Sequence, residues 1–207
     1  MSSPTRVAIV TGAALGLGRA IALRLAADGL HVVALERRRL LSDVTVEENV
    51  KNLVAFAVST FGGLDVMVAN AGTAFVKSIL DTTLEDVDGL FNINFRAAFL
   101  SYKYAAKQMI AQGRGGRIIG AASAVAKKGF PFMSTYSATK FAIRALTQSA
   151  AQEWGAYGIT VNAYCPGIIW TPLIEALGAS LASVVGQADA DPKEMASCTA
   201  DIFLIQR

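Results

Sequence analysis

The sequence predicts an α/β protein in which one doubly wound parallel sheet lies between two layers of helices. Two observations lead to this prediction. Short stretches that are apolar on both faces, typical of buried parallel strands, alternate with stretches of helical period, and a glycine-rich turn joins the first strand to the first helix. A chain of 207 residues that is 53% hydrophobic is long enough for a single core. We therefore expect one domain over residues 1–207.

The first unit of the chain is strand, glycine turn, helix and strand within about thirty residues. Residues 7–10 form the apolar first strand, 11–18 the glycine turn, 19–28 the helix and 31–35 the second strand, which Glu36 closes. Glycines let a backbone approach a pyrophosphate, and the helix N-terminus offers N–H groups and the positive end of its dipole. The carboxylate of Glu36 can accept hydrogen bonds from the hydroxyls of an adenosine ribose. The alternative is a tight turn that binds no ligand.

The rest of the chain continues this alternation. Residues 46–61 have a helical period and end at a Gly-Gly pair. The further elements expected are, in chain order, a strand at 64–69, a long helix at 84–112, a strand at 116–120, a helix at 136–155 and a strand at 159–163. Strands that alternate with helices in this way favour a parallel sheet.

Composition excludes several classes of protein. A net charge of +3 is too small to indicate a nucleic-acid partner, and glycines and prolines interrupt the longest uncharged run, residues 154–174, so no membrane span is expected. The N-terminus has no apolar signal region, which favours a cytoplasmic protein. The lone His31 and the widely separated Cys165 and Cys198 form no metal-ligand spacing, so we expect no metal.

Tyr136 and Lys140 lie four residues apart in a predicted helix, which places both side chains on one face. A phenol with an ordinary pKa near ~10 is a poor proton donor or acceptor at neutral pH, but a neighbouring ammonium favours the phenolate. A general acid or base works best when its pKa lies near the working pH. Taken alone, the pair also fits a surface helix with an unremarkable tyrosine.

Thr-Gly-x-x-x-Gly-x-Gly followed by Tyr-x-x-x-Lys resembles the short-chain dehydrogenase/reductase family, over residues 6–171. The resemblance implies a Rossmann-like fold and hydride transfer between a nicotinamide and a small ketone or secondary alcohol. It implies that Tyr136 protonates the carbonyl oxygen and that Lys140 binds the nicotinamide ribose and lowers the tyrosine pKa. Ser123 would position the substrate oxygen, and Asn94 would hold a water that relays protons to Lys140. Ser123 as a strand-end cap and Asn94 as a helix-bending residue are the alternatives.

The resemblance also implies a set of cofactor contacts. They are Gly12, Leu15, Gly16, Leu17, Gly18, Glu36, Arg37, Asp43, Val44, Asn70, Ala71, Gly72, Tyr136, Lys140, Pro166, Gly167, Ile169 and Thr171. Glu36 favours NAD(H), because its carboxylate repels a 2′-phosphate. The adjacent Arg37 could instead meet that phosphate, so NADP(H) stays possible. Ala69 replaces the first Asn of the family's Asn-Asn-Ala-Gly turn, which weakens one strand-end hydrogen bond.

Residues 168–190 correspond to the family's substrate-covering segment. Its apolar residues Leu173, Ile174, Leu177, Leu181, Val184 and Val185 fit an apolar lid and fit equally well a helix packed on the core. Phe130, Phe132, Met133 and Trp170 would make the pocket apolar or belong to the core. Residues 112–119, 138–148 and 158–168 resemble acetoin/diacetyl reductases, the butanediol dehydrogenase group, which implies a diacetyl- or acetoin-like substrate.

The chain departs from the family in two places. Only six residues separate Glu36 from Asp43, too few for a crossover helix between parallel strands. The usual third strand is therefore expected to be absent, unless Leu40 and Leu41 pair irregularly. The sequence stops at Arg207 without the usual last strand, which would weaken a homo-oligomer. We expect five strands in the family order 2-1-4-5-6. An impaired dinucleotide-binding protein or an inactive truncated product is the alternative function.

Overall fold

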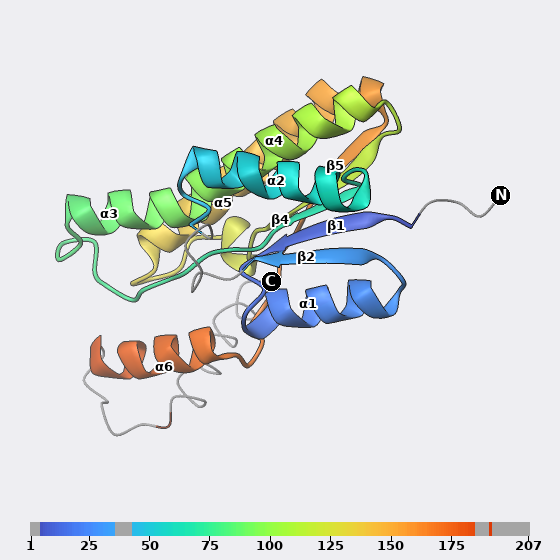
Figure 1. The fold of residues 1–207 in the computed structure, drawn as a ribbon. Coiled ribbons are helices and arrows are strands. Elements are labelled where there is room, and N and C mark those ends of the chain that lie inside the picture. The colour runs from blue at the N-terminus through green and yellow to red at the C-terminus, as the bar shows by residue number, and fades with distance from the viewer. Residues whose placement is uncertain (1–4, 36–42, 185–190, 192–207) are drawn as a thin grey trace.

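A computed structural model of the chain describes residues 5–35, 43–184 and 191. Five parallel strands form one sheet in the order β2-β1-β3-β4-β5, with helices on both of its faces (Figure 1). This arrangement confirms the predicted fold class and the predicted strand order. The possible irregular pairing of residues 40–41 with the sheet and the end of the substrate segment, residues 185–190, lie outside the described residues.

The strands agree with the prediction to within two residues at each end. The sheet consists of β1 Val7–Thr11, β2 His31–Leu35, β3 Val66–Ala69, β4 Gly116–Ala121 and β5 Ile159–Tyr164. The helices are α1 Gly16–Ala27, α2 Glu47–Phe61, α3 Leu84–Phe91, α4 Ala97–Gln112, α5 Ser134–Trp154 and α6 Pro172–Val184. A π-helical turn, η1 Asn92–Arg96, joins α3 to α4, so the single long helix that was predicted contains an irregular turn.

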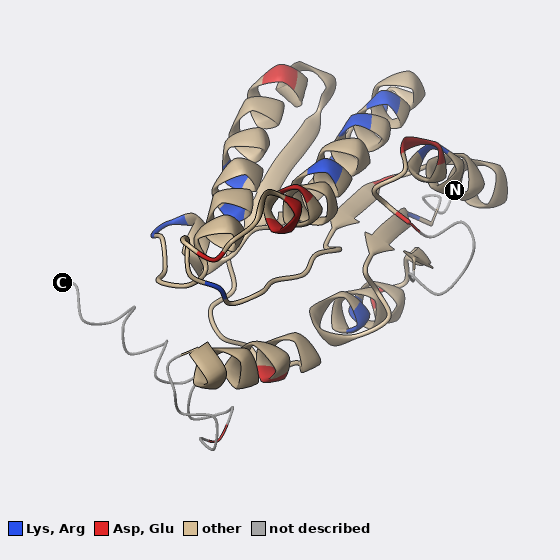
Figure 2. Ribbon diagram, turned by 90° about the vertical axis from the view of Figure 1, so that its left-hand side faces the viewer, with Lys and Arg blue, Asp and Glu red and all other residues tan. Residues whose placement is uncertain are grey.

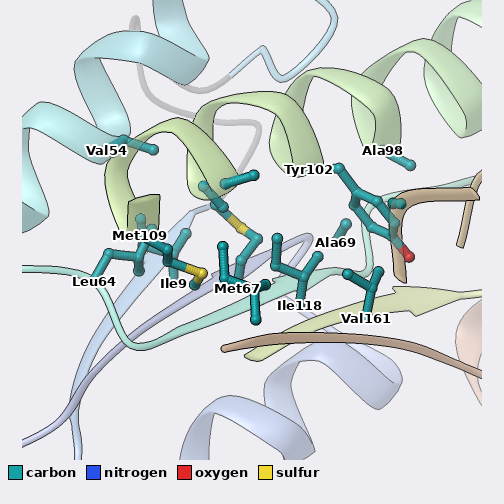
Figure 3. Close-up of a cluster of buried hydrophobic side chains, with 14 of the residues drawn as sticks. Ile9, Val54, Leu64, Met67, Ala69, Ala98, Tyr102, Met109, Ile118 and Val161 are labelled. Carbon is teal, nitrogen blue, oxygen red and sulfur yellow. The ribbon is translucent and has the colours of Figure 1, made fainter. Parts of the chain in front are cut away.

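The two faces of the sheet pack against different helices. Ile9, Met67 and Ile118 point toward α2, α4 and α5, where Tyr102 is also fully buried (Figure 3). On the other face, the neighbouring positions of β1 and β3 pack against α1. Because successive strand residues point to opposite faces, a central strand must be apolar throughout. The first strand, which is completely buried, meets that requirement.

The start of α1 differs from the prediction. The helix begins at Gly16, three residues earlier than expected, because two glycines with a low helix propensity belong to its first turn. Leu15 stands at the N-cap, where its side chain makes no capping hydrogen bond. The first N–H groups of α1 therefore face the carboxyl ends of the strands without a side-chain partner at the N-cap.

No described helix combines the length and the apolar character that a bilayer crossing requires. Within the same described residues, no three His, Cys, Asp or Glu side chains come together as a metal site. His31 stacks on Phe61 with 4.6 Å between ring centroids, which is a structural contact.

Candidate active site

The glycine turn between β1 and α1 is held by side chains from the neighbouring strands. The Asn70 side chain donates to the carbonyl oxygens of Thr11 and Gly12, at 3.0 and 3.2 Å. Gly12 has a φ of +65°, which glycine adopts without strain. A Cβ atom on Gly18 would stand 2.2 Å from the Gly12 carbonyl oxygen. The turn can therefore keep this shape only with glycine at position 18.

A groove of about 320 Å³ follows this turn along the carboxyl ends of the strands. The predicted contacts that line it are Gly12, Leu15, Gly16, Leu17, Gly18, Asn70, Ala71, Gly72, Tyr136, Lys140, Pro166 and Thr171. The first turn of α1 carries no acidic residue and no side-chain cap. Free N–H groups and the positive end of a helix dipole suit a phosphate group. The residues present thus fit a dinucleotide whose pyrophosphate lies at the start of α1.

Six predicted cofactor contacts lie elsewhere. Glu36 and Arg37 fall outside the described residues. Gly167 and Ile169 line the adjoining apolar pocket. The last two, Asp43 and Val44, precede α2: the Asp43 carboxylate accepts hydrogen bonds from the backbone and hydroxyl of Thr45, and Val44 is buried in a small cluster beside α4. Those contacts give Asp43 and Val44 a structural role, and their part in cofactor binding stays a prediction.

Tyr136, in the first turn of α5, stands between the groove and the apolar pocket and lines both. Burial raises the pKa of its phenol above the ordinary value, and a hydrogen bond with the Ser123 side chain opposes that effect. Ser123 follows β4, and its hydroxyl also accepts a hydrogen bond from the Val125 N–H at 3.3 Å. Ser123 thus caps the turn after β4 and also reaches the catalytic tyrosine predicted from the sequence.

Lys140 lies one helical turn after Tyr136 and is 4% exposed. Its ammonium donates a 2.7 Å hydrogen bond to the Ala121 carbonyl and lies 5.5 Å from the centroid of the Tyr136 ring. Burial lowers the pKa of Lys140 to about 8. The spacing argument predicted that Lys140 lowers the pKa of Tyr136. In the structure burial dominates and the pKa of that phenol is raised.

Asn94 is completely buried in the π-helical turn η1 and lines neither cavity. Its side-chain oxygen accepts from the Thr73 N–H at 2.9 Å, and its amide donates to the Thr73 carbonyl and the Thr139 hydroxyl. The Thr139 hydroxyl in turn donates to the backbone oxygen of Tyr136 at 2.7 Å. Asn94 therefore ties the segment after β3 to α5, and its role in a proton relay stays a prediction.

Two residues that support the site were missed in the sequence. The Thr11 hydroxyl accepts hydrogen bonds from the Asn70 and Ala71 N–H groups, at 3.0 and 3.1 Å. These bonds join the ends of β1 and β3, where Ala69 replaces the family's asparagine. Tyr164 lines the groove and donates to the Asn70 side-chain oxygen at 2.7 Å. Both are polar residues at the carboxyl end of a parallel strand, a signal that could have identified them.

An apolar pocket of about 150 Å³ adjoins Tyr136 on the side away from the groove. Helix α6 forms one wall of this pocket through Leu173, Ile174, Leu177, Gly178 and Leu181. The sequence left open whether this apolar segment is a lid or a packed helix. The structure shows a helix with two buried small residues, Gly178 and Ala182, and its neighbouring apolar residues lining the pocket.

Fold and site together define a class of protein, the dinucleotide-dependent oxidoreductases. A glycine turn at the start of a helix, a buried tyrosine–lysine pair and an apolar pocket meet at the carboxyl edge of a parallel sheet. The sequence pattern of the short chain dehydrogenase family matches residues 6–41 and 39–182. The chain belongs to this family, as the resemblance predicted. The match divides at residues 39–41, inside the region where the sequence departs from the family.

Similar proteins support this assignment. A short-chain dehydrogenase/reductase of Armillaria gallica is 48% identical over 194 residues, covering 84% of this chain and 74% of the relative. The L-2,3-butanediol dehydrogenase of Corynebacterium glutamicum is 39% identical over 204 residues, covering 88% and 79%. The solved structure of ElxO with NADP bound has a TM-score of 0.78 at 30% identity, covering 87% of this chain and 79% of that one. The protein is therefore an oxidoreductase of the NAD(P)-binding type.

The buried charge of Lys140 is expected to lower the stability of the cofactor-free protein. A pKa of about 8 instead of 10.5 corresponds to about 3 kcal/mol of unfavourable burial at neutral pH. Lys140→Met keeps a linear side chain and loses one charged hydrogen bond to Ala121, worth ~1.5–3 kcal/mol. We expect the variant to be about 1 kcal/mol more stable at pH 7, as measured by urea unfolding.

The stability difference between Lys140→Met and the wild type should depend on pH. Between pH 10.5 and pH 8 the unfolded chain binds the Lys140 proton more readily than the folded chain, so the wild type loses stability as the pH falls through that window. The advantage of Lys140→Met should therefore shrink between pH 8 and pH 10. Lys127→Met, which changes an exposed lysine, is the matched control. A less stable Lys140→Met protein at pH 7 would contradict the prediction.

Proposed function

We propose that the protein transfers a hydride between a nicotinamide cofactor and a small ketone or secondary alcohol. The observation that carries this proposal is the position of Tyr136, which lines both the dinucleotide groove and the apolar pocket. A proton donor at that boundary can reach a carbonyl oxygen whose carbon faces the groove. The butanediol dehydrogenase relative supports 2,3-butanediol as a compound to test, and the sequence resemblance to acetoin/diacetyl reductases supports diacetyl and acetoin.

Residues of the chain would handle the proton and the substrate oxygen. Tyr136 would donate the proton of its phenol to the carbonyl oxygen during reduction. Burial raises the pKa of this phenol in the cofactor-free protein and makes it a weaker acid there. Ser123 would hydrogen-bond the same oxygen and hold it beside the phenol. The cofactor, when bound, supplies or accepts the hydride. For alcohol oxidation Tyr136 must lose its proton, and the ammonium of Lys140 close to its ring stabilises the resulting phenolate.

The groove suggests which residues would hold the cofactor. The N–H groups of Gly16, Leu17 and Gly18 would bind the pyrophosphate at the start of α1. Lys140 would exchange its bond with the Ala121 carbonyl for the hydroxyls of the nicotinamide ribose. Thr171, which lines both cavities, would meet the carboxamide.

A titration followed by an assay tests the proposal. Binding of NADH and NADPH is followed by fluorescence, and then the reduction of diacetyl and of a simple ketone is measured. Binding together with turnover supports the proposal. Binding without turnover of any carbonyl compound would instead favour a dinucleotide-binding protein without catalytic activity.

NAD(H) is expected to bind more tightly than NADP(H). Glu36 follows the strand that ends at Leu35, where a carboxylate would accept hydrogen bonds from the ribose and repel a 2′-phosphate. Both dissociation constants are measured at the same salt concentration, because phosphate binding depends on ionic strength. Arg37→Ala is the companion variant. A preference for NADPH that survives in Arg37→Ala would show that Glu36 does not meet the ribose.

A further inference from the structure

Few of the described side chains that line the apolar pocket can form hydrogen bonds. Among the eighteen described residues that line it, three have polar side chains, Ser123, Tyr136 and Thr171, and none of these eighteen is charged. The hydroxyl of Thr171 already accepts from the N–H of Ile174 at the start of α6. Ser123 and Tyr136 are hydrogen-bonded to each other, so both address the same oxygen of a substrate.

Most of the remaining described lining residues are apolar and come from five segments of the chain. They include Val76 after β3, Val125 after β4, Phe130 and Met133 before α5, Ile168 after β5, and Ile174, Leu177 and Leu181 of α6. The described residues of α6, Pro172–Val184, carry one charged side chain, that of Glu175, and Figure 2 colours such acidic positions red. Glu175 does not line the pocket.

A second oxygen on the substrate would be poorly accommodated by these walls. A polar group that leaves water without a new hydrogen bond loses binding free energy. A diketone or a diol places its second oxygen on the carbon next to the reacting one, beyond the Ser123–Tyr136 pair and toward apolar side chains. An apolar group at that carbon gains about fourfold in binding for each methylene it buries.

The volume of the pocket sets the size of the apolar group. Apolar cavities of about 150 Å³ in proteins hold a ligand of the size of benzene. A four-carbon diketone leaves part of such a space unfilled. A six-membered ring, or a chain of similar volume, fills the space and excludes water from the reacting carbon.

We propose that the substrate carries a single reacting oxygen on an apolar body of about six to eight carbons, in preference to a four-carbon diketone or diol. This inference rests on the proposed function. In the reduction, the carbonyl carbon gains a hydride from the reduced nicotinamide and the carbonyl oxygen gains the proton of Tyr136. The products are the secondary alcohol and the oxidised cofactor, and Tyr136 regains its proton from water.

Four secondary alcohols test separately the size of the apolar body and the effect of a second oxygen on the substrate. With oxidised cofactor, kcat/KM is measured for 2-butanol, 2,3-butanediol, cyclohexanol and 2-octanol. We expect cyclohexanol and 2-octanol to exceed 2-butanol at least tenfold, and 2,3-butanediol to fall at or below 2-butanol. A kcat/KM for 2,3-butanediol above those of cyclohexanol and 2-octanol would overturn this inference and leave the proposed function intact. No oxidation of any of the four, with cofactor bound, would overturn both.

A substitution in α6 tests whether the pocket wall formed by this helix sets the preference for larger apolar alcohols. Leu177→Asn introduces an amide into the pocket, while Ala179→Asn changes an exposed position of the same helix. The readout is the ratio of kcat/KM for 2-octanol to that for 2-butanol, which does not depend on the folded fraction. We expect the ratio to fall about tenfold in Leu177→Asn and to stay at the wild-type value in Ala179→Asn. An unchanged ratio in Leu177→Asn would overturn the assignment of α6 as the specificity wall.

Discussion

Replacing Tyr136 with phenylalanine is expected to lower kcat by a factor on the order of 10²–10⁴. The variant keeps the ring that lines both cavities and removes only the hydroxyl. Ser123 would still hydrogen-bond the substrate oxygen, but no group of suitable acidity would donate the proton. Because the ring of residue 136 and all the other predicted cofactor contacts stay in place, the Kd of NADH should change by less than about threefold.

The measurement compares single-turnover rates with cofactor affinities in the same preparation. Tyr157→Phe is the matched control, because Tyr157 is 53% exposed and lies outside both cavities. The control should keep the wild-type rate and affinity. A Tyr136→Phe enzyme that retains a rate within tenfold of the wild type would refute the role of Tyr136 as the general acid.

The sequence predicted the sheet well because the buried strands carry an unambiguous signal. A short uninterrupted apolar run such as residues 7–10, followed by a glycine turn, is typical of a strand buried on both faces of a parallel sheet. The start of α1 was less predictable. Local propensity disfavours glycine in a helix, yet Gly16 and Gly18 lie in its first turn, since a side chain at position 18 would collide with the Gly12 carbonyl. The long helix at 84–112 was predicted without its π-helical turn.

The site was predictable as a set of residues but not as a set of contacts. Spacing placed Tyr136 and Lys140 on one face of a helix, and the structure brings both to the groove. Spacing does not reveal burial, which raises the pKa of Tyr136 here and lowers that of Lys140. The Tyr164–Asn70 hydrogen bond joins residues 94 positions apart, so only the folded sheet brings them together.

Gly18→Ala is expected to raise the Kd of the cofactor by at least about 100-fold. The new methyl group would stand 2.2 Å from the Gly12 carbonyl oxygen and 2.4 Å from the Asn70 side-chain nitrogen. Neither neighbour can move freely, because Asn70 is held by Tyr164 and by the backbone of Thr11. The turn must therefore shift and carry the first N–H groups of α1 away from the pyrophosphate. Overpacking of this kind also costs ~1–3 kcal/mol of stability.

Gly89→Ala separates this effect from the general consequence of adding a methyl group to a helical glycine. Gly89 lies within α3, and a Cβ atom there would have no heavy atom within 4 Å. Alanine in an open helical position stabilises by ~0.5–1 kcal/mol, so this control should be slightly more stable and bind cofactor like the wild type. Kd is measured by NADH fluorescence at a temperature where circular dichroism shows both variants folded. A folded Gly18→Ala protein that binds NADH within threefold of the wild type would show that the turn adapts without displacing the N–H groups at the start of α1.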